Sequence, residues 1–140
     1  MISEEYAEMA SLLIDEDEDL SYLKDFPVTI IYLKSDKEKK SGGKVVKGEC
    51  EKVSDKNKWA IPADFCIIIY ENNCAGMSDD QMKILMKHEL LHIKVDEDGN
   101  YKIRKHDLED FRCITRRYGA DWSTPGYSVK PLDDEEAETY

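Results

Sequence analysis

One segment, residues 78–93, carries the clearest structural signal in the chain. Ser78 is followed three residues later by Gln81, which is the S-x-x-Q pattern of an N-terminal capping box. Asp79 and Asp80 suit the positively polarised first turn of a helix, and apolar residues recur at helical spacing up to Ile93. The sequence therefore predicts a helix that begins at Ser78.

The segments on either side alternate between helix and strand signals. Ser3 can cap an N-terminal helix, whose apolar face is predicted to contain Tyr6, Met9, Leu12 and Leu13. Residues rich in β-branched and aromatic side chains predict strands at 28–33 and 65–70, and an alternating pattern predicts another at about 44–53. A tight turn at 98–100 separates two short apolar runs, and Asp107 can cap a final helix that extends to Tyr118.

The chain length favours a single folded domain. The protein has 140 residues, and a chain of this size can bury about two-thirds of its unfolded surface in one core. We expect this domain to span residues 1–122 and to be followed by a flexible acidic tail at 123–140. No apolar stretch approaches the ~20 residues of a membrane span, and the N-terminus lacks signal-peptide features, so a soluble cytoplasmic protein is expected.

The cysteines and the charge exclude several functional classes. The four cysteines form no C-x-x-C pair and are expected to be buried free thiols, and a mixed Cys/His zinc site has no support from their spacing. The formal net charge of −11 argues against broad binding to a phosphate backbone. Residues 34–58 nevertheless carry nine lysines, so nucleic acid remains a weaker candidate partner.

Two of the three histidines of the chain lie four residues apart, in Met86-Lys-His-Glu-Leu-Leu-His-Ile93. On a helix this spacing places His88 and His92 on one face, where both imidazoles can bind one zinc ion. Glu89 is displaced round the helix and can act as the general base on a metal-activated water. This is the H-E-x-x-H pattern of metallopeptidases, and it predicts hydrolysis of peptide bonds.

A catalytic zinc ion usually has three protein ligands, so the sequence must supply one more. His106 is the strongest candidate, because it is the remaining histidine and follows a turn that can bring the chain back. Asp107, Glu109 and Asp110 are the substitutes, since carboxylates also bind zinc. The metzincin arrangement is excluded, because its additional glycine and histidine would fall where this chain has Val95 and Asp98.

Further elements of a peptidase site are less clearly marked. Lys87, Tyr101 or Arg104 could donate a hydrogen bond to the developing oxyanion, or none of them could. The strand at 65–70 could pair with an extended substrate through its backbone, and it could equally be a plain core strand.

Several segments, in order, resemble the putative phage metallopeptidase family. They are SDKEKKSGGKVVKGECEKV, KWAIPADF, DDQMKILMKHELLHI, DEDGN, HDLEDF and YGADW, and together they cover about residues 20–122. The resemblance implies an α+β, minimal zincin-like fold, in which a small β-sheet packs on the helix carrying H-E-x-x-H, with flanking N- and C-terminal helices. It also implies that His106 is the next metal-site residue, as in the similar SprT-like metallopeptidases, and that the protein acts on a protein or peptide substrate in the cytoplasm of a bacterial host cell.

Two other functions remain open at this stage. The histidines could hold a structural zinc ion in a non-catalytic binding module, with a fourth protein ligand such as Asp110 or a cysteine closing the site. Alternatively, the protein could be a DNA-associated SprT-like protein that uses its lysine-rich segment. The oligomeric state is not predicted by the sequence.

Overall fold

The computed structural model describes residues 1–105, 111–118 and 122–123, and these form an α+β fold. The α-helices of the described residues are α1 (Glu4–Glu16), α2 (Tyr22–Asp25), α3 (Asp79–Leu90) and α4 (Arg112–Tyr118). The strands are β1 (Ile30–Ser35), β2 (Lys40–Ser41), β3 (Lys44–Val45), β4 (Gly48–Lys52), β5 (Phe65–Tyr70), β6 (Ile93–Val95) and β7 (Tyr101–Ile103). Short 3-10 helices are η1 (Glu18–Leu20), η2 (Asp55–Asn57) and η3 (Glu71–Cys74).

The main sheet has three strands in the order β1-β5-β4. Strand β5 is parallel to β1 and antiparallel to β4, with Ile67 opposite both Tyr32 and Cys50. The prediction of a strand at 65–70 is confirmed, and its apolar run is explained by its central position, since Phe65 and Ile67 are completely buried. Because β5 is paired with β1 on one side and β4 on the other, its backbone cannot pair with a substrate strand. The suggestion that residues 65–70 bind substrate is therefore wrong, and the alternative of a plain core strand is correct.

The predicted strand at 44–53 is divided in the structure. Gly42 and Gly43 have positive φ angles of 58° and 78° and form the turn of the small hairpin β2–β3. Glycine adopts this backbone conformation without steric cost, so the chain reverses there and joins the main sheet only at Gly48. Strand β4 therefore begins four residues later than the alternating pattern indicates.

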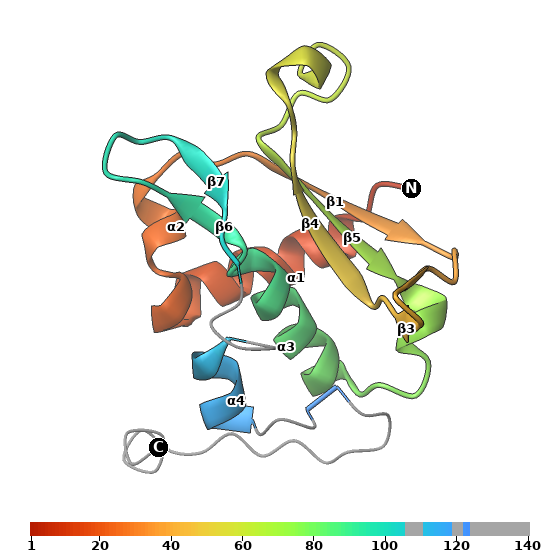
Figure 1. The fold of residues 1–140 in the computed structure, drawn as a ribbon. Coiled ribbons are helices and arrows are strands. Elements are labelled where there is room, and N and C mark those ends of the chain that lie inside the picture. The colour runs from red at the N-terminus through yellow and green to blue at the C-terminus, as the bar shows by residue number, and fades with distance from the viewer. Residues whose placement is uncertain (106–110, 119–121, 124–140) are drawn as a thin grey trace.

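Helix α3 lies in the middle of the fold, between the main sheet and α4 (Figure 1). Its capping box is present as predicted: Ser78 Oγ accepts from Gln81 N at 3.2 Å, and Gln81 Oε1 accepts from Ser78 N at 2.8 Å. Leu85, Met86 and Leu90 bury its apolar face in the core. Helix α3 thus has a fixed start and a fixed orientation against the sheet.

Helix α1 packs against α3 and β1, and Ser3 caps it as predicted. Tyr6 is buried, and Met9 and Leu13 pack against the core, as predicted, whereas Leu12 is 60% exposed and does not belong to the buried face. After Glu16 the acidic run leaves the helix and forms η1. The run is therefore not only solvated surface, because it brings two of its carboxylates to α3, as described below.

The hairpin β6–β7 confirms the turn signal at 98–100. Asp96 Oδ1 accepts from the backbone N–H groups of Asp98 and Asn100 at 3.0 and 2.9 Å, and Gly99 has a φ of 81°. Strand β7 also lies against β4. This hairpin returns the chain to the end of α3.

The remaining predictions concern the cysteines, the membrane and the C-terminus. All four cysteines are free, as expected, but only Cys66 and Cys74 are buried, whereas Cys50 and Cys113 are partly exposed. In the described part of the chain no helix combines the length and the apolar character needed to cross a bilayer. The predicted cap Asp107 and, apart from Ser123, the predicted tail at 123–140 lie outside the described residues, while α4 begins at Arg112.

Candidate metal centre

His88, Glu89 and His92 converge at the C-terminal end of α3. Their potential ligand atoms all lie within 4.8 Å of one another. The two imidazole rings meet edge to face with centroids 5.2 Å apart, and His92 Nε2 is 4.0 Å from Glu89 Oε1. Within the described residues this is the one group of histidine, cysteine and carboxylate side chains close enough to share a metal ion.

His92 does not lie on the helix itself, contrary to the simple helical prediction. Helix α3 ends at Leu90, and the N–H of His92 bonds to the carbonyl of Glu89, three residues earlier, at 3.2 Å. The last turn is therefore tightened, as is common at helix C-termini. His92 consequently sits in the turn that leads into β6, yet its ring still reaches the ring of His88.

The backbone of Arg104 orients the ring of His92. His92 Nδ1 lies 2.8 Å from the carbonyl oxygen of Arg104, just after β7. A carbonyl can only accept, so Nδ1 is the protonated nitrogen of the neutral ring, and the lone pair of a neutral imidazole is then on Nε2. This arrangement is typical of metal-binding histidines, whose other ring nitrogen donates to an oxygen atom.

Two aromatic residues pack around the histidine pair. The ring of Phe111 lies 5.3 Å from His88 and 5.2 Å from His92, centroid to centroid, and Trp122 lies 6.1 Å from His88. Gln81 Nε2 donates to the carbonyl of Trp122 at 2.8 Å, so the capping residue of α3 also fixes this aromatic wall. Apolar packing restricts the imidazoles to few orientations.

Glu89 is buried, with 3% of its surface exposed, and it faces β4. An added Cβ at Gly48 would lie 3.1 Å from Glu89 Oε2 and 3.3 Å from Cγ and Cδ. The backbone of β4 therefore approaches the carboxylate as closely as only glycine allows. Cys50, two residues along, has its thiol pKa raised by burial and by the negative charge of Glu89, so it stands beside the carboxylate as a neutral thiol.

Lys87 is excluded as an oxyanion donor. Its side chain is 1% exposed, and its ammonium lies 3.0 Å from Asp17 Oδ2 and 2.7 Å from Asp19 Oδ2. Burial lowers the pKa of Lys87, but the hydrogen bonds to Asp19 and Asp17 outweigh it, and the net pKa is raised. Of the other two suggested donors, Tyr101 packs on Phe65, and the guanidinium of Arg104 lies 5.0 Å from the ring centre of Phe111.

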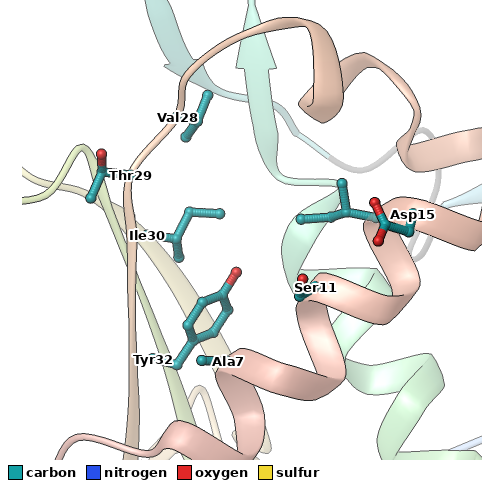
Figure 2. A pocket seen from close by; sticks show the side chains of 8 residues that line it. Ala7, Ser11, Asp15, Val28, Thr29, Ile30 and Tyr32 are labelled. Carbon is teal, nitrogen blue, oxygen red and sulfur yellow. The ribbon is translucent and has the colours of Figure 1, made fainter.

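A cleft with a volume of about 430 Å³ opens on the site. His88 and Glu89 line it from α3, Gly48 lines it from β4, and Lys44 and Lys47 line it from the preceding residues. Figure 2 shows a different hollow, of about 390 Å³, between α1 and β1, with Ser11 and Asp15 on one side and Ile30 and Tyr32 on the other. The hollow between α1 and β1 is lined by none of His88, Glu89 and His92. Of these two cavities, only the cleft beside β4 opens on the candidate metal centre.

His106 and its suggested substitutes, Asp107, Glu109 and Asp110, lie outside the described residues. The structure thus brings together His88, Glu89 and His92 and leaves the third ligand untested. Sequence reasoning missed Gly48, Phe111 and Trp122 as parts of the site. An isolated glycine in the strand-like run KGECEK was a usable signal for Gly48, since such glycines often mark a close approach.

Comparison with known proteins agrees with the family suggested by the sequence segments. A search of curated proteins and a search of solved structures each find no match. The model of the putative phage metallopeptidase family matches residues 1–130, a longer span than the segments that carry the resemblance. The chain therefore belongs to the putative phage metallopeptidase family.

Proposed function

We propose that this protein is a zinc-dependent peptidase with a minimal zincin-like fold, in which His88, His92 and His106 hold the metal and Glu89 is the general base. One observation carries the proposal: the donor atoms of His88, Glu89 and His92 lie within 4.8 Å of one another, and His88 and Glu89 line a cleft. Family membership supports a metallopeptidase at a coarser level. The identity of the metal as zinc, the roles of the individual residues and the catalytic mechanism go beyond family membership and are part of this proposal.

The donor set fits zinc. Imidazole nitrogen is a preferred ligand of this ion, and the hydrogen bond from His92 Nδ1 to the Arg104 carbonyl leaves the other ring nitrogen with its lone pair. The buried carboxylate of Glu89 adds the negative charge that a divalent cation requires nearby. When bound, zinc supplies Lewis acidity, which lowers the pKa of a coordinated water to ~7 and polarises a carbonyl group.

The chain path supports His106 as the third ligand. The undescribed residues 106–110 connect Lys105 to Phe111. Arg104, on one side, bonds to His92 through its carbonyl, and Phe111, on the other side, packs on both His88 and His92. Described residues before and after the segment that contains His106 therefore contact the histidine pair.

Glu89 is suited to the role of base. Its Oε1 lies 4.0 Å from His92 Nε2, so a water molecule held beside that nitrogen would be within hydrogen-bonding reach of the carboxylate. In a peptidase it would take a proton from the attacking water and pass it to the leaving amine. Gly48 holds the carboxylate in place from the opposite side by contact.

Strand β4 is the candidate strand for substrate binding. In the described sheet it is paired only with β5, and β7 also lies against it, so a substrate strand would pair with the part of the second edge that β7 does not cover. Its first residue, Gly48, touches Glu89. An extended peptide that pairs with this edge would pass beside the base and the histidines.

A catalytic role is favoured over the alternative of a structural zinc site. Structural zinc sites are closed by four protein ligands, whereas catalytic sites remain open to solvent. Here His88 and Glu89 line a cleft, and within the described residues no cysteine joins the cluster.

The test is the substitution Glu89→Gln, which removes the base and keeps the shape of the side chain. We expect about one zinc ion per chain in both proteins and a loss of kcat/KM of roughly 10²- to 10⁴-fold in the variant. Zinc is measured by elemental analysis, and hydrolysis is measured on casein and on a proteome-derived peptide library.

Glu97→Gln is the matched control, because Glu97 is exposed in the β6–β7 turn. It should retain the activity of the parent protein. A Glu89→Gln protein as active as the parent would contradict the assignment of the base, and a parent protein that binds no zinc would contradict the metal centre.

A further inference from the structure

We propose that the cleft selects substrates with an acidic side chain close to the scissile bond, and that Lys44 and Lys47 recognise this side chain. The inference rests on the proposed peptidase function and names its substrate class. It begins from the lining of the cleft, in which these two lysines occur together with His88 and Glu89.

The two lysines have no ionic partner among the described residues. Three other lysines of this region do have ionic partners: Lys39 pairs with Glu49, Lys58 with Asp55 and Asp64, and Lys87 with Asp17 and Asp19. No carboxylate of the described residues lies within ion-pairing distance of Lys44 or Lys47. Their charges are therefore available to a ligand in the cleft.

The acidic residues of β4 do not offset this charge. Gly48 and Cys50 face the core side, opposite Ile69 and Ile67, and Gly48 touches Glu89. Glu49 is not part of the cleft lining; it binds Lys39 and accepts a hydrogen bond from Tyr70 at 2.8 Å. Glu51, the other carboxylate of the strand, is also absent from the lining.

The position of the lysines relative to β4 indicates where the acidic side chain would lie. Lys47 directly precedes Gly48, and Lys44 belongs to β3. Because Lys47 directly precedes Gly48, which contacts Glu89, and a peptide extended along β4 advances about 3.3 Å per residue, we expect the acidic side chain within roughly three substrate residues of the scissile bond. At that distance the positive charges of the lysines would favour substrates with an acidic side chain at one position, in addition to attracting acidic peptides in general.

An acidic peptide is favoured over nucleic acid as the ligand. The whole chain has a formal charge of −11, which opposes a long phosphate backbone. Two lysines in the lining of a cleft match one or two carboxylates, and a low-dielectric cleft focuses their field locally. The overall negative charge is compatible with such a short-range preference.

The experiment uses a set of matched peptides. A single Glu, Gln or Lys is moved through the positions on both sides of one cleavable bond in an otherwise uncharged host peptide, and kcat/KM is measured for the zinc-loaded full chain. We expect Glu to exceed Gln by at least roughly tenfold at one position within three residues of the bond, which corresponds to about 1.4 kcal/mol. The double substitution Lys44→Glu and Lys47→Glu should reverse the preference in favour of the Lys peptide.

The matched control is Lys37→Glu with Lys56→Glu. It makes the same change in charge at two exposed lysines of the same lysine-rich segment, outside the lining of the cleft. This variant should keep the preference of the parent protein. Equal effects of the two double variants would overturn the inference, because they would show a general charge effect.

A binding measurement separates this inference from the proposed function. Fluorescence anisotropy with the zinc-loaded Glu89→Gln protein should show tighter binding of the Glu peptide than of the Gln peptide, and the difference should be lost in the Lys44 and Lys47 variant. If the peptides are cleaved and bound but Glu is not preferred over Gln, only the inference about substrate class is overturned. If no peptide is cleaved, the proposed peptidase function itself is contradicted. Displacement of the Glu peptide by duplex DNA at lower concentration than by acidic peptide would assign the lysines to nucleic acid instead.

Discussion

Gly48 is the residue of the main sheet that lies against Glu89, the proposed general base. Its missing side chain allows the backbone of β4 to touch Glu89, since an added Cβ would lie 3.1 to 3.3 Å from three atoms of that side chain. Contacts this short require one partner to shift by a few tenths of an ångström. If Glu89 is the base, as proposed, such a shift would change its alignment with the attacking water.

We therefore predict that Gly48→Ala lowers kcat/KM about tenfold, equivalent to about 1.4 kcal/mol of transition-state stabilisation. Zinc content should remain that of the parent protein. Glu51→Ala, at an exposed position of the same strand, is the control and should be close to the parent. Parental kinetics in Gly48→Ala would show that the position of Glu89 does not depend on this contact.

At the residue scale the sequence predicts the identity of the central cluster and misses its surroundings. The H-E-x-x-H spacing is sufficient to bring His88 and His92 together, even though His92 lies in the turn after α3. The contacts of Gly48 with Glu89 and of Phe111 with the histidines join residues far apart in the chain. Short-range patterns contain no information on such pairs.

At the scale of elements, a buried ion pair attaches α3 to η1. Lys87 directly precedes His88, and its ammonium is held between Asp17 and Asp19. Removal of the ammonium would leave two carboxylates close together, one of them with only 9% of its side chain exposed. Breaking a buried pair in this way is more costly than losing a surface pair.

We predict that Lys87→Met lowers the free energy of unfolding by about 3 kcal/mol, measured by urea denaturation. Lys83→Met, one turn earlier on the exposed face of α3, should change it by less than about 0.5 kcal/mol.

Because the pKa of Lys87 is raised by folding, its stabilising effect is complete below its unfolded pKa of ~10.4 and is lost as pH rises through the folded value. The difference between parent and Lys87→Met should therefore be constant from neutral pH and diminish only in strong alkali; a loss that begins at neutral pH would contradict the ion pair.

The elements that were predicted well are those with local signals. Helix α3 has a capping box at its start, and β5 is an unbroken apolar run, so the start of α3 and the whole of β5 lie where the sequence places them, although α3 ends before His92. The division of residues 44–53 and the edge position of β4 depend on which strands pair, and pairing is decided by contacts between distant segments. The exposed Leu12 has the same origin, because the face that α1 buries is chosen by α3 and β1.

At the scale of the whole molecule, metal binding is expected to stabilise the fold. The proposed ligands come from the end of α3 and from the segment after β7, so the metal would join two elements that the chain separates by a hairpin. An ion that binds only the native state raises its stability by mass action. The protein should accordingly lose stability when the ion is removed.

We predict that removal of zinc with a chelator lowers Tm by roughly 10 °C, because free zinc at a hundredfold excess over its Kd stabilises by about 2.7 kcal/mol. The effect should disappear roughly below pH 5–6, since only neutral imidazole binds the metal. Differential scanning calorimetry with and without the chelator measures it, and His88→Ala is the control, whose Tm should not respond to zinc. An equal response in His88→Ala would place the stabilising ion elsewhere.

The most direct test of the central claim is a crystal structure of the zinc-saturated protein with anomalous diffraction recorded at the zinc edge. The account predicts one strong anomalous peak with imidazole nitrogens of His88, His92 and His106 at about 2.0–2.1 Å, and with the Glu89 carboxylate beside a remaining open position. A structure without a peak at His88 and His92, or with His106 far from them, would contradict the account.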